Sequence, residues 1–387
     1  MTRPDLEEVR ARLARTGGSW TPHDVATVLR DLGWAVSDAM VLATVEALHR
    51  ASTGWGPLDE LGHLDGVTDI LVNGPDQVFV DRGRGLERVS VHFDDDTQVR
   101  CLATRLAARV GRRLDDASPW VDARLPDGTR LHAVLGTLAD PGTCISLRLH
   151  SGGHMSITDW VANGSISERM AALLGVVVTS RVGFLVSGGT GSGKTTLLSA
   201  LLGLVPAEHR LLVVEDSREL APGHPHCVRL ECRPPNSEGI GAVTMTDLVR
   251  QALRMRPDRL VVGEVRGGEL CDLLTAMNTG HEGGCGTIHA NSVADLPARL
   301  EALAALGGLG REACHCQVAA ALDVVVQVSR LAAGRRAVTQ IGMVGTDDAG
   351  RVVIVEAVTS PDGHRVVAGP GWSRFAARVG LPEAGAP

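Results

Sequence analysis

The spacing of apolar residues changes several times along this 387-residue chain, and each change predicts a different kind of structure. Helical spacing marks the start, where apolar residues recur at Leu6, Val9, Leu13, Val25, Val28 and Leu29. Ser37 is a helix-capping residue type, and the helix after it is expected to extend through His49. Residues 1–52 therefore predict an N-terminal helical segment, and the glycine- and proline-containing stretch 53–57 separates it from the rest of the chain.

Residues 55–150 contain short apolar stretches separated by turn residues, which is the pattern of β-hairpins. The expected strands are 70–73, 77–80, 120–125, 129–134 and 144–149, with turns at 81–85 and 126–128 and a helix from Asp96 to Arg113. This mixture predicts a small α+β domain. The small and polar residues Ser151-Gly152-Gly153-His154 then predict a hinge, within a linker placed at 151–157.

Residues 158–380 alternate between expected strands and helices. The stretches 182–187, 211–215 and 259–264 are almost continuously apolar, which is typical of parallel strands buried on both faces of a sheet. Further strands are expected at 324–328, 337–343 and 351–355, on the periphery. The pattern predicts a second, larger α/β domain, followed by a disordered tail at 381–387 that is rich in proline and alanine.

A glycine-rich loop lies between the first apolar run and the next helix, and it contains the single lysine of the chain, Lys194. The segment Gly188-Gly189-Thr190-Gly191-Ser192-Gly193-Lys194-Thr195 matches the phosphate-binding loop G-x-x-x-x-G-K-[ST]. Its amides, from Gly189 to Thr196, would bind phosphate oxygens at a helix N-terminus. The ammonium of Lys194 would reach between the β- and γ-phosphates, and Thr195 would offer its hydroxyl to Mg²⁺. The alternative is a chance glycine-rich turn.

Two acidic positions follow the other apolar runs, at the strand ends where ligands bind in open α/β sheets. Gly263 stands where an aspartate is usual at the strand end, and Glu264 follows it. We expect Glu264 to bind Mg²⁺ through water, to position the attacking water, or to do both. Glu215 stands beside Asp216 at the next strand tip and is a candidate for positioning water and metal. The alternatives are an acidic residue at a helix start for Glu264 and a solvated turn for Glu215.

A third candidate segment runs from Gly280 to Asn291 and places four glycines around a Thr-Ile-His strand. Glycines at this density are typical of a loop that approaches a ligand closely. His289 ends the strand, and its alternative role is that of a structural histidine.

Composition narrows the classes of function. The formal net charge of −7 and the low aromatic content of 3%, without tyrosine, argue against a surface that binds nucleic acid. No apolar run approaches the ~20 residues of a membrane span, and the charged N-terminus does not resemble a signal peptide. We therefore expect a cytoplasmic protein without a transmembrane segment, which reaches a membrane only through partners.

The chain has eight cysteines, and none belongs to a C-x-x-C pair. Reduced thiols are expected in a cytoplasmic protein. Cys314-His315-Cys316 looks like a metal motif, but one close pair does not make a zinc site, and any function of Cys314 and Cys316 stays open.

Taken in order, these segments resemble the secretion ATPase superfamily, whose members power type II secretion, type IV secretion and conjugation, and type IV and tight-adherence (Flp) pili. The resemblance rests on four motifs: GGTGSGKTT at the glycine loop, VVEDSREL at 213–220, RLVVGEVRGGE at 259–269 and TGHEGGCGTIHANS at 279–292. The stretches NGPDQVFVD, ARLPDGTRLHAV and VRLECRPPNSEGIGAVTMTDLVRQALRMRPDR look like the tight-adherence branch. The similarity covers about residues 55–330.

The resemblance implies an α/β fold with a RecA-like P-loop NTPase core and a mainly parallel sheet, preceded by a small α+β domain and the helical segment. It implies that ATP and Mg²⁺ bind at the glycine loop, with Glu264 as catalytic acid, Glu215 supporting metal or water, and His289 sensing the γ-phosphate. Arg130 and Arg148 match positions where the family reaches nucleotide with arginine, and their alternative is a solvated strand face. The tetracysteine zinc module of some members is absent.

The resemblance also implies a homohexamer that holds nucleotide between the two domains of each subunit and drives an inner-membrane platform protein from the cytoplasmic face. The function expected is ATP hydrolysis coupled to pilus assembly or type II-like secretion. A conjugation or type IV secretion ATPase shares every motif, and a regulatory scaffold with little turnover is a further alternative. A RecA-like nucleic-acid motor fits the charge poorly. Substrate, direction of work, the choice between pilus and conjugation system, ring stoichiometry and platform partner stay open, as does the role of residues 1–50.

Overall fold

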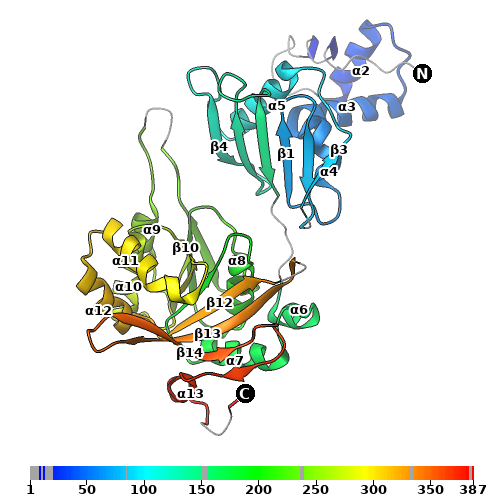
Figure 1. Cartoon of the computed structure of the whole chain (residues 1–387). Coiled ribbons are helices and arrows are strands. Elements are labelled where there is room, and N and C mark those ends of the chain that lie inside the picture. The colour runs from blue at the N-terminus through cyan, green and yellow to red at the C-terminus, as the bar shows by residue number, and fades with distance from the viewer. Residues whose placement is uncertain are drawn as a thin grey trace. The chain divides into compact units, whose positions relative to one another are not determined.

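The computed structural model describes residues 8–9, 12–13, 21–83, 85–149, 155–235, 239–331, 334–382 and 386–387. The chain divides into two compact units, Met1–Ser151 and Gly152–Pro387 (Figure 1). The hinge expected at Ser151–His154 lies outside the described residues, as do Glu383–Gly385 of the expected tail.

The first unit begins with two helices, α2 (Pro22–Asp31) and α3 (Asp38–Thr53). Thr21 starts α2 with a capping box, in which its side chain and that of Asp24 each accept a backbone N–H. The Ser37 hydroxyl accepts the N–H of Met40 at the start of α3, 3.3 Å away. Helix α3 extends past His49, where the sequence pattern had ended it. A small separate core joins these helices and contains Val9, Leu13, Val25, Ala26, Val28, Leu29, Val41 and Leu48.

The rest of this unit is a six-stranded sheet in the order β3-β2-β1-β6-β5-β4, with every neighbouring pair antiparallel. The strands are β1 (Asp69–Asn73), β2 (Val78–Asp81), β3 (Leu86–Val89), β4 (Trp120–Arg124), β5 (Arg130–Val134) and β6 (Cys144–Arg148). Alternate residues face a core shared with α5 (Asp96–Arg109), η1 (Gly56–Leu58) and α4 (Asp59–Gly62). The sequence pattern missed β3 and α4. It also ran α5 to Arg113, although Gly111, with φ +69°, ends the helical backbone earlier.

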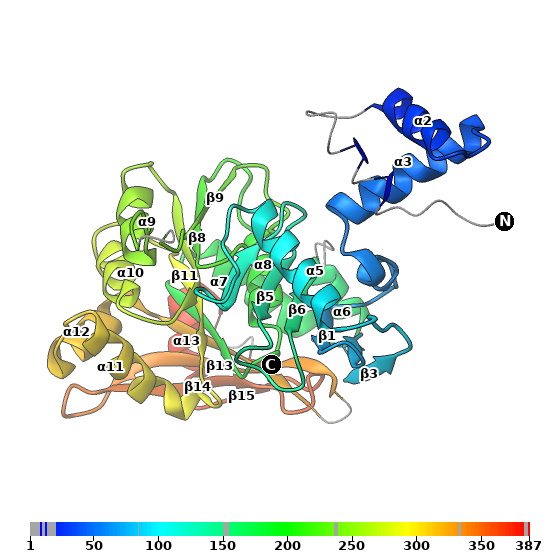
Figure 2. The ribbon, with the colours of Figure 1, turned by 90° about the horizontal axis from the view of Figure 1, so that it is seen from above.

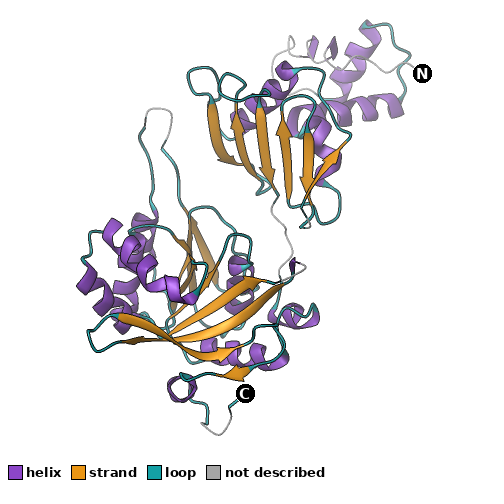
Figure 3. Ribbon diagram, in the orientation of Figure 1, coloured by secondary structure: helices purple, strands orange, loops and turns teal. Residues whose placement is uncertain are grey.

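The second unit is built on a nine-stranded sheet in the order β15-β14-β13-β12-β7-β11-β10-β8-β9 (Figure 3). The six strands from β12 to β9 are parallel, and β13, β14 and β15 continue the sheet antiparallel. The strands are β7 (Phe184–Gly188), β8 (Leu211–Glu215), β9 (Cys227–Glu231), β10 (Arg259–Val265), β11 (Cys285–His289), β12 (Val324–Arg330), β13 (Arg336–Thr346), β14 (Val352–Thr359) and β15 (Val367–Ala368). The expected strands at 337–343 and 351–355 are thus longer than the pattern showed.

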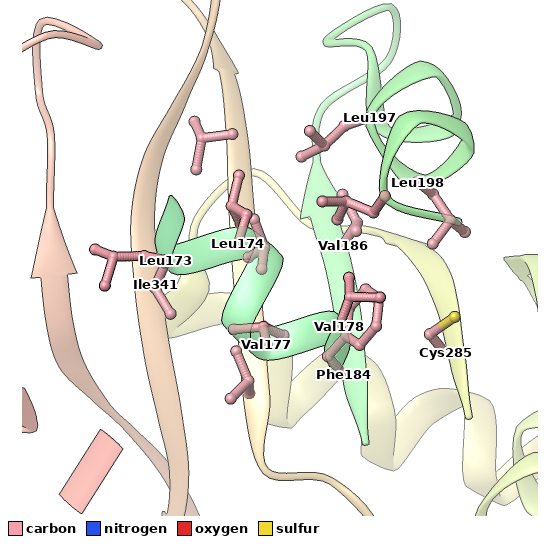
Figure 4. Close-up of a cluster of buried hydrophobic side chains, with 14 of the residues drawn as sticks. Leu173, Leu174, Val177, Val178, Phe184, Val186, Leu197, Leu198, Cys285 and Ile341 are labelled. Atoms are coloured by element: carbon pink, nitrogen blue, oxygen red, sulfur yellow. The ribbon is translucent and has the colours of Figure 1, made fainter. Parts of the chain in front are cut away.

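Helices cover both faces of this sheet, which explains the continuous apolar runs (Figures 1 and 2). One core contains α6 (Ile157–Ala162), α7 (Glu168–Thr179), α8 (Lys194–Leu202) and α13 (Trp372–Val379); the other contains α9 (Met245–Leu253), α10 (Glu269–Asn278), α11 (Leu296–Leu306) and α12 (Arg311–Ala321). Successive residues of β7 alternate between the cores: Phe184 and Val186 face α7 and α8, as Figure 4 shows, and Leu185 faces the other side. Successive residues of such a strand are therefore all buried.

The strand order defines the fold class. Strand β7 precedes the glycine loop. Strand β11 lies between β7 and β10, and β10 carries Glu264. This is the arrangement of a RecA-like P-loop core, preceded here by an α+β unit and a helical segment, so the predicted fold class is confirmed. Within the described residues, no helix is both long enough and apolar enough to span a membrane.

Candidate functional site

The predicted site residues of the second unit meet at one edge of the sheet. Because β8, β10, β11 and β7 are parallel, their carboxyl ends coincide. His289 pairs in register with Gly188, the last residue of β7, and Val214 pairs with Val262 one residue before Glu215 and Gly263. The edge therefore collects the glycine loop, both acidic segments and the histidine in one place, which is where open α/β sheets bind ligands.

The glycine loop has the backbone shape of a phosphate cradle. Gly191 and Gly193 adopt left-handed backbone with φ of +68° and +99°, which residues with a Cβ rarely adopt. A Cβ on Gly188 would lie 2.4 Å from the Val328 carbonyl oxygen, so the last residue of β7 must also be glycine. Thr190 and Gly191 are exposed, whereas Ser192 is buried and its Oγ has no hydrogen-bond partner in the described chain. The loop thus leaves an unused polar atom beside exposed backbone.

Lys194 begins α8 and is buried, with 8% of its surface exposed. Its Nζ donates to the Gly189 carbonyl oxygen at 3.1 Å, and it forms no ion pair with any residue that the structure describes. Burial lowers the pKa of the Lys194 ammonium, an effect that the nearby charge of Glu264 partly offsets. Thr195 and Thr196 follow, half-buried, in the first helical turn. A buried cation at a helix N-terminus without an acidic partner is suited to bind an anionic ligand.

Glu215 is buried at the end of β8, with 2% of its surface exposed, so the alternative of a solvated turn is wrong. Its Oε1 accepts the N–H groups of Glu219 at 2.9 Å and Leu220 at 2.8 Å. Its Oε2 is buried without a hydrogen-bond partner in the described chain. Burial raises the pKa of the Glu215 carboxyl above its ordinary value. One oxygen therefore fixes the side chain, and the other is uncommitted.

Gly263 explains how Glu215 reaches this position. A Cβ on Gly263 would lie 2.6 Å from Glu215 Cγ and 3.2 Å from its Oε1, so the glycine leaves the space that the carboxylate side chain occupies. The carbonyl of Gly263 accepts the hydroxyl of buried Thr287 at 2.7 Å, which holds β10 against β11 at this point. An aspartate at position 263 would exclude Glu215. The carboxylate that fills the space beside position 263 therefore comes from β8.

Gly263→Ala is expected to destabilise the fold by ~1–3 kcal/mol, because the new methyl group overpacks a buried position, and to impair any reaction that uses Glu215. Thermal unfolding and activity would check this. Gly175→Ala is the control. Gly175 lies within helix α7, and the nearest atom that a new Cβ on Gly175 would meet is Leu204 Cδ1, at 4.0 Å. The control is expected to keep or raise stability. Equal melting of Gly263→Ala and wild type would contradict the packing argument.

Glu264 lies within β10, one residue before its end, and its side chain is 27% exposed. The helix that follows starts at Glu269, so the alternative that Glu264 is a helix-start residue is wrong. Arg266 donates to Glu264 Oε2 through Nε at 2.8 Å and also through its second terminal nitrogen. Arg266 lies 3.7 Å from Asp216 as well. The partly exposed carboxylate of Glu264 is thus held by Arg266, which also lies near Asp216 at the neighbouring strand tip.

His289 is the last residue of β11 and is half-buried beside the glycine loop. The loop after it is tied to β7 and β12 by a polar network that the sequence did not reveal. Gln327 of β12 donates to the Asn291 carbonyl at 3.2 Å, and the Ser187 hydroxyl donates to the Gln327 carboxamide oxygen. Both Ser187 and Gln327 are buried. A glutamine inside the apolar run 324–328 was the available signal, because buried polar groups need partners.

Arg130 and Arg148 belong to the first unit, where they are register partners on β5 and β6. Arg130 bonds Asp122 through two nitrogens, at 2.9 and 3.3 Å, and Arg148 bonds Asp69 at 2.9 Å. Both side chains therefore contact aspartates of adjacent strands. Their contact with nucleotide stays a prediction.

All eight cysteines are free thiols. His315, which stands between Cys314 and Cys316 in the sequence, is buried. Its two ring nitrogens contact Glu301 Oε1 at 2.9 Å and the N–H of Val352 at 3.0 Å. Its ring thus holds α12 against α11 and β14. Among the described residues, no group of three or more histidines, cysteines or acids is arranged to hold a metal ion.

Comparison with known proteins places these motifs in context. The family model described as "Type II/IV secretion system protein" matches residues 52–370. A Mycobacterium tuberculosis protein named "Putative conjugal transfer protein Rv3659c" is 54% identical over 314 residues, which cover 80% of this chain and 89% of that protein. The type IV secretion system protein VirB11 of Brucella suis is 31% identical over 288 residues, covering 68% of this chain and 80% of VirB11.

Among solved structures, the ATPase DotB of Yersinia pseudotuberculosis matches with a TM-score of 0.50 at 16% identity, covering 80% of this chain and 78% of that one. At this identity the likeness concerns the fold alone.

Proposed function

The chain belongs to the family of type II/IV secretion system proteins, and from this premise we propose that it binds and hydrolyses ATP at the glycine loop and couples the reaction to pilus assembly or type II-like secretion. The observation that carries the proposal is Lys194, the single lysine, buried at the N-terminus of α8 without an acidic partner among the described residues. The polyphosphate of ATP supplies the missing anion. The loop amides and the Ser192 hydroxyl supply the remaining donors.

The residues at the edge of the sheet also fit Mg²⁺. Hard cations prefer oxygen ligands, and this edge offers the Thr195 hydroxyl, the uncommitted Glu215 Oε2 and the exposed carboxylate of Glu264. We place Thr195 on the metal directly and Glu264 through water. When bound, Mg²⁺ neutralises charge on the β- and γ-phosphate oxygens. The buried Glu215 Oε2, which has no hydrogen-bond partner among the described residues, supports a metal site at this edge.

Four side chains have separate roles in the proposed hydrolysis. Lys194 stabilises negative charge that develops on the phosphate oxygens. Glu264 orients the attacking water, for which its partly exposed carboxylate is better placed than the buried Glu215. Glu215 holds the metal side of the site in place. His289, on the strand adjacent to the loop, contacts the γ-phosphate side and transmits its loss through the network of Asn291, Gln327 and Ser187.

Glu215→Gln is expected to raise stability by ~0.5–2 kcal/mol at pH 8 while lowering hydrolysis, because it removes a buried charge from a functional site. Burial raises the pKa of the Glu215 carboxyl in the folded state, so the wild type loses stability as the pH rises above 4.5 towards that raised pKa. The gain in melting temperature should therefore be larger at pH 8 than at pH 4.5. Asp216→Asn, at an exposed neighbouring carboxyl, is the control. A gain that does not depend on pH would refute this assignment.

We extend the proposal to the whole machine on the basis of family membership. The subunits form a homohexamer at the cytoplasmic face of the inner membrane and act on a membrane platform protein. Residues 1–52, 55–150 and 158–380 form the helical segment, the first domain and the ATPase domain, and 151–157 is the hinge. Direct binding of nucleic acid is not part of this function, in keeping with the net charge of −7.

A conjugation or type IV secretion ATPase is the second candidate. The specific support is the names of the relatives, a conjugal transfer protein at 54% identity and a type IV secretion protein at 31%. The two candidates share the same chemistry at the site. Deleting the gene and counting pili and plasmid transfer in the same strain separates them, because each machine would lose only its own output.

Phosphate release from ATP, measured with Mg²⁺ and again with a chelator, tests the activity itself. The proposal predicts release that requires Mg²⁺, from a protein that also binds ATP. Binding of ATP without release, in the assembled oligomer and with its platform present, would favour the regulatory scaffold and overturn the motor.

A further inference from the structure

Two arginines flank the glycine loop from the side opposite to the acids. Arg330 ends β12 and Arg336 begins β13, and the two are directly paired in the antiparallel register. Both are exposed. Within the described part of the chain, neither side chain forms an ion pair or a hydrogen bond, which distinguishes them from Arg335, whose guanidinium donates to the Gly164 carbonyl.

Arg336 contacts the loop itself. A Cβ on Gly193 would lie 3.1 Å from Arg336 Cδ and 3.4 Å from the ring of Trp160. The Arg336 and Trp160 side chains therefore pack against Gly193, the residue that precedes Lys194. Val328 of β12 pairs with Gly188, where the glycine loop starts. Arg330 lies two residues further along β12. The guanidinium of Arg336 begins one bond beyond this Cδ, so it starts beside the glycine loop.

The strand order fixes which end of a bound nucleotide this is. Strands β11 and β10, with His289 and Glu264, lie on one side of β7, and β12 and β13 lie on the other. Hydrolysis requires the γ-phosphate to face Glu264. The phosphate chain then extends away from β10, so its α-phosphate is the group nearest to β12 and β13.

The charges at this position are unbalanced in the protein alone. Like charges directly opposite each other on antiparallel strands are destabilising. Arg266, a further cation near the loop, is already bound to Glu264 and lies close to Asp216. Among the described residues near the loop, the arginine pair thus adds uncommitted positive charge to that of Lys194, and an anion between the two guanidinium groups would relieve their repulsion.

We propose that Arg336, assisted by Arg330, binds the α-phosphate of the nucleotide and so sets affinity for ATP and ADP alike. The inference rests on the proposed function, since it assigns two further residues to the same nucleotide site. Guanidinium groups suit this role because they bind phosphate oxygens with two parallel hydrogen bonds. The contact is made equally before and after hydrolysis, so it contributes to binding and not to the chemical step.

The test is calorimetric titration of ATP and ADP, each with Mg²⁺, into wild type, Arg336→Gln, Arg330→Gln and Arg351→Gln, together with steady-state hydrolysis. Arg336→Gln should weaken both nucleotides by about tenfold or more, with kcat within about twofold of wild type. Arg330→Gln should show a smaller loss. Arg351→Gln is the matched control, because it removes an arginine beyond the opposite end of β13, where Arg351 is paired with Asp347.

Three outcomes would overturn the inference. Unchanged affinity for both nucleotides would exclude the contact, weakened ATP with unchanged ADP would move it to the γ-phosphate, and a loss confined to kcat would make the arginine catalytic. Melting temperatures should hold or rise in both variants, because each removes a like-charge contact. If wild type itself fails to bind nucleotide, the proposed function fails, and this result differs from every outcome above.

Discussion

Lys194→Ala is expected to slow ATP hydrolysis by ~10²–10³ while leaving the fold intact. The ammonium stabilises charge that grows on the phosphate oxygens in the transition state, and no other lysine exists in the chain to replace it. Folding should tolerate the change, because the buried ammonium makes one hydrogen bond to the Gly189 carbonyl, and its burial is unfavourable enough to lower its pKa. Steady-state phosphate release and thermal unfolding measure the two effects.

Lys194→Arg is the informative companion variant. It keeps the positive charge but replaces a compact ammonium by a planar fork in a position with 8% of its surface exposed. We expect it to lose activity almost as fully as alanine does. Retention of most activity by Lys194→Ala would mean that the site has been assigned to the wrong residues.

Glu264→Gln is expected to bind ATP with near wild-type affinity and to hydrolyse it ~10²–10⁴-fold more slowly. Glutamine preserves the size of the side chain but removes the charge that orients the attacking water. Since Arg266 is bound to Glu264 here, the substitution also frees this cation for its weaker neighbour Asp216. Titration of ATP and phosphate release, on the same preparation, separate binding from chemistry.

Glu231→Gln is the matched control. Glu231 also ends a parallel strand of the sheet, is exposed to a similar extent, 24% against 27%, and is also paired with an arginine, Arg218. It lies on the edge strand β9, two strands away from β10, and should keep nearly full activity. Loss of ATP binding by Glu264→Gln would instead identify Glu264 as a metal anchor.

The sequence predicted those parts of the molecule whose pattern is local. Buried parallel strands require apolar side chains on both faces, so 182–187, 211–215 and 259–264 were recognisable before any tertiary contact was known. The glycine loop needs left-handed backbone at Gly191 and Gly193, which leaves a sequence signature of its own. These features determine the RecA-like core.

The parts that the sequence did not reveal depend on contacts between distant segments. The burial of Glu215 depends on the absence of a Cβ at Gly263, 48 positions along the chain and on another strand. The proximity of Arg336 to Gly193 follows from the pairing of β12 with β7 and of β13 with β12. Helix ends such as that of α5 depend on single residues with unusual backbone. None of these leaves a periodic pattern.

The central claim is that the chain is an assembling ATPase, and one experiment tests it directly. Light scattering would record the mass of wild type at micromolar concentration with and without a saturating non-hydrolysable ATP analogue, while phosphate release from ATP is followed over the same protein concentrations. The account predicts a hexamer with nucleotide, and a rate per subunit that rises where the hexamer forms. A monomer at saturating analogue, without hydrolysis at any concentration, would contradict it.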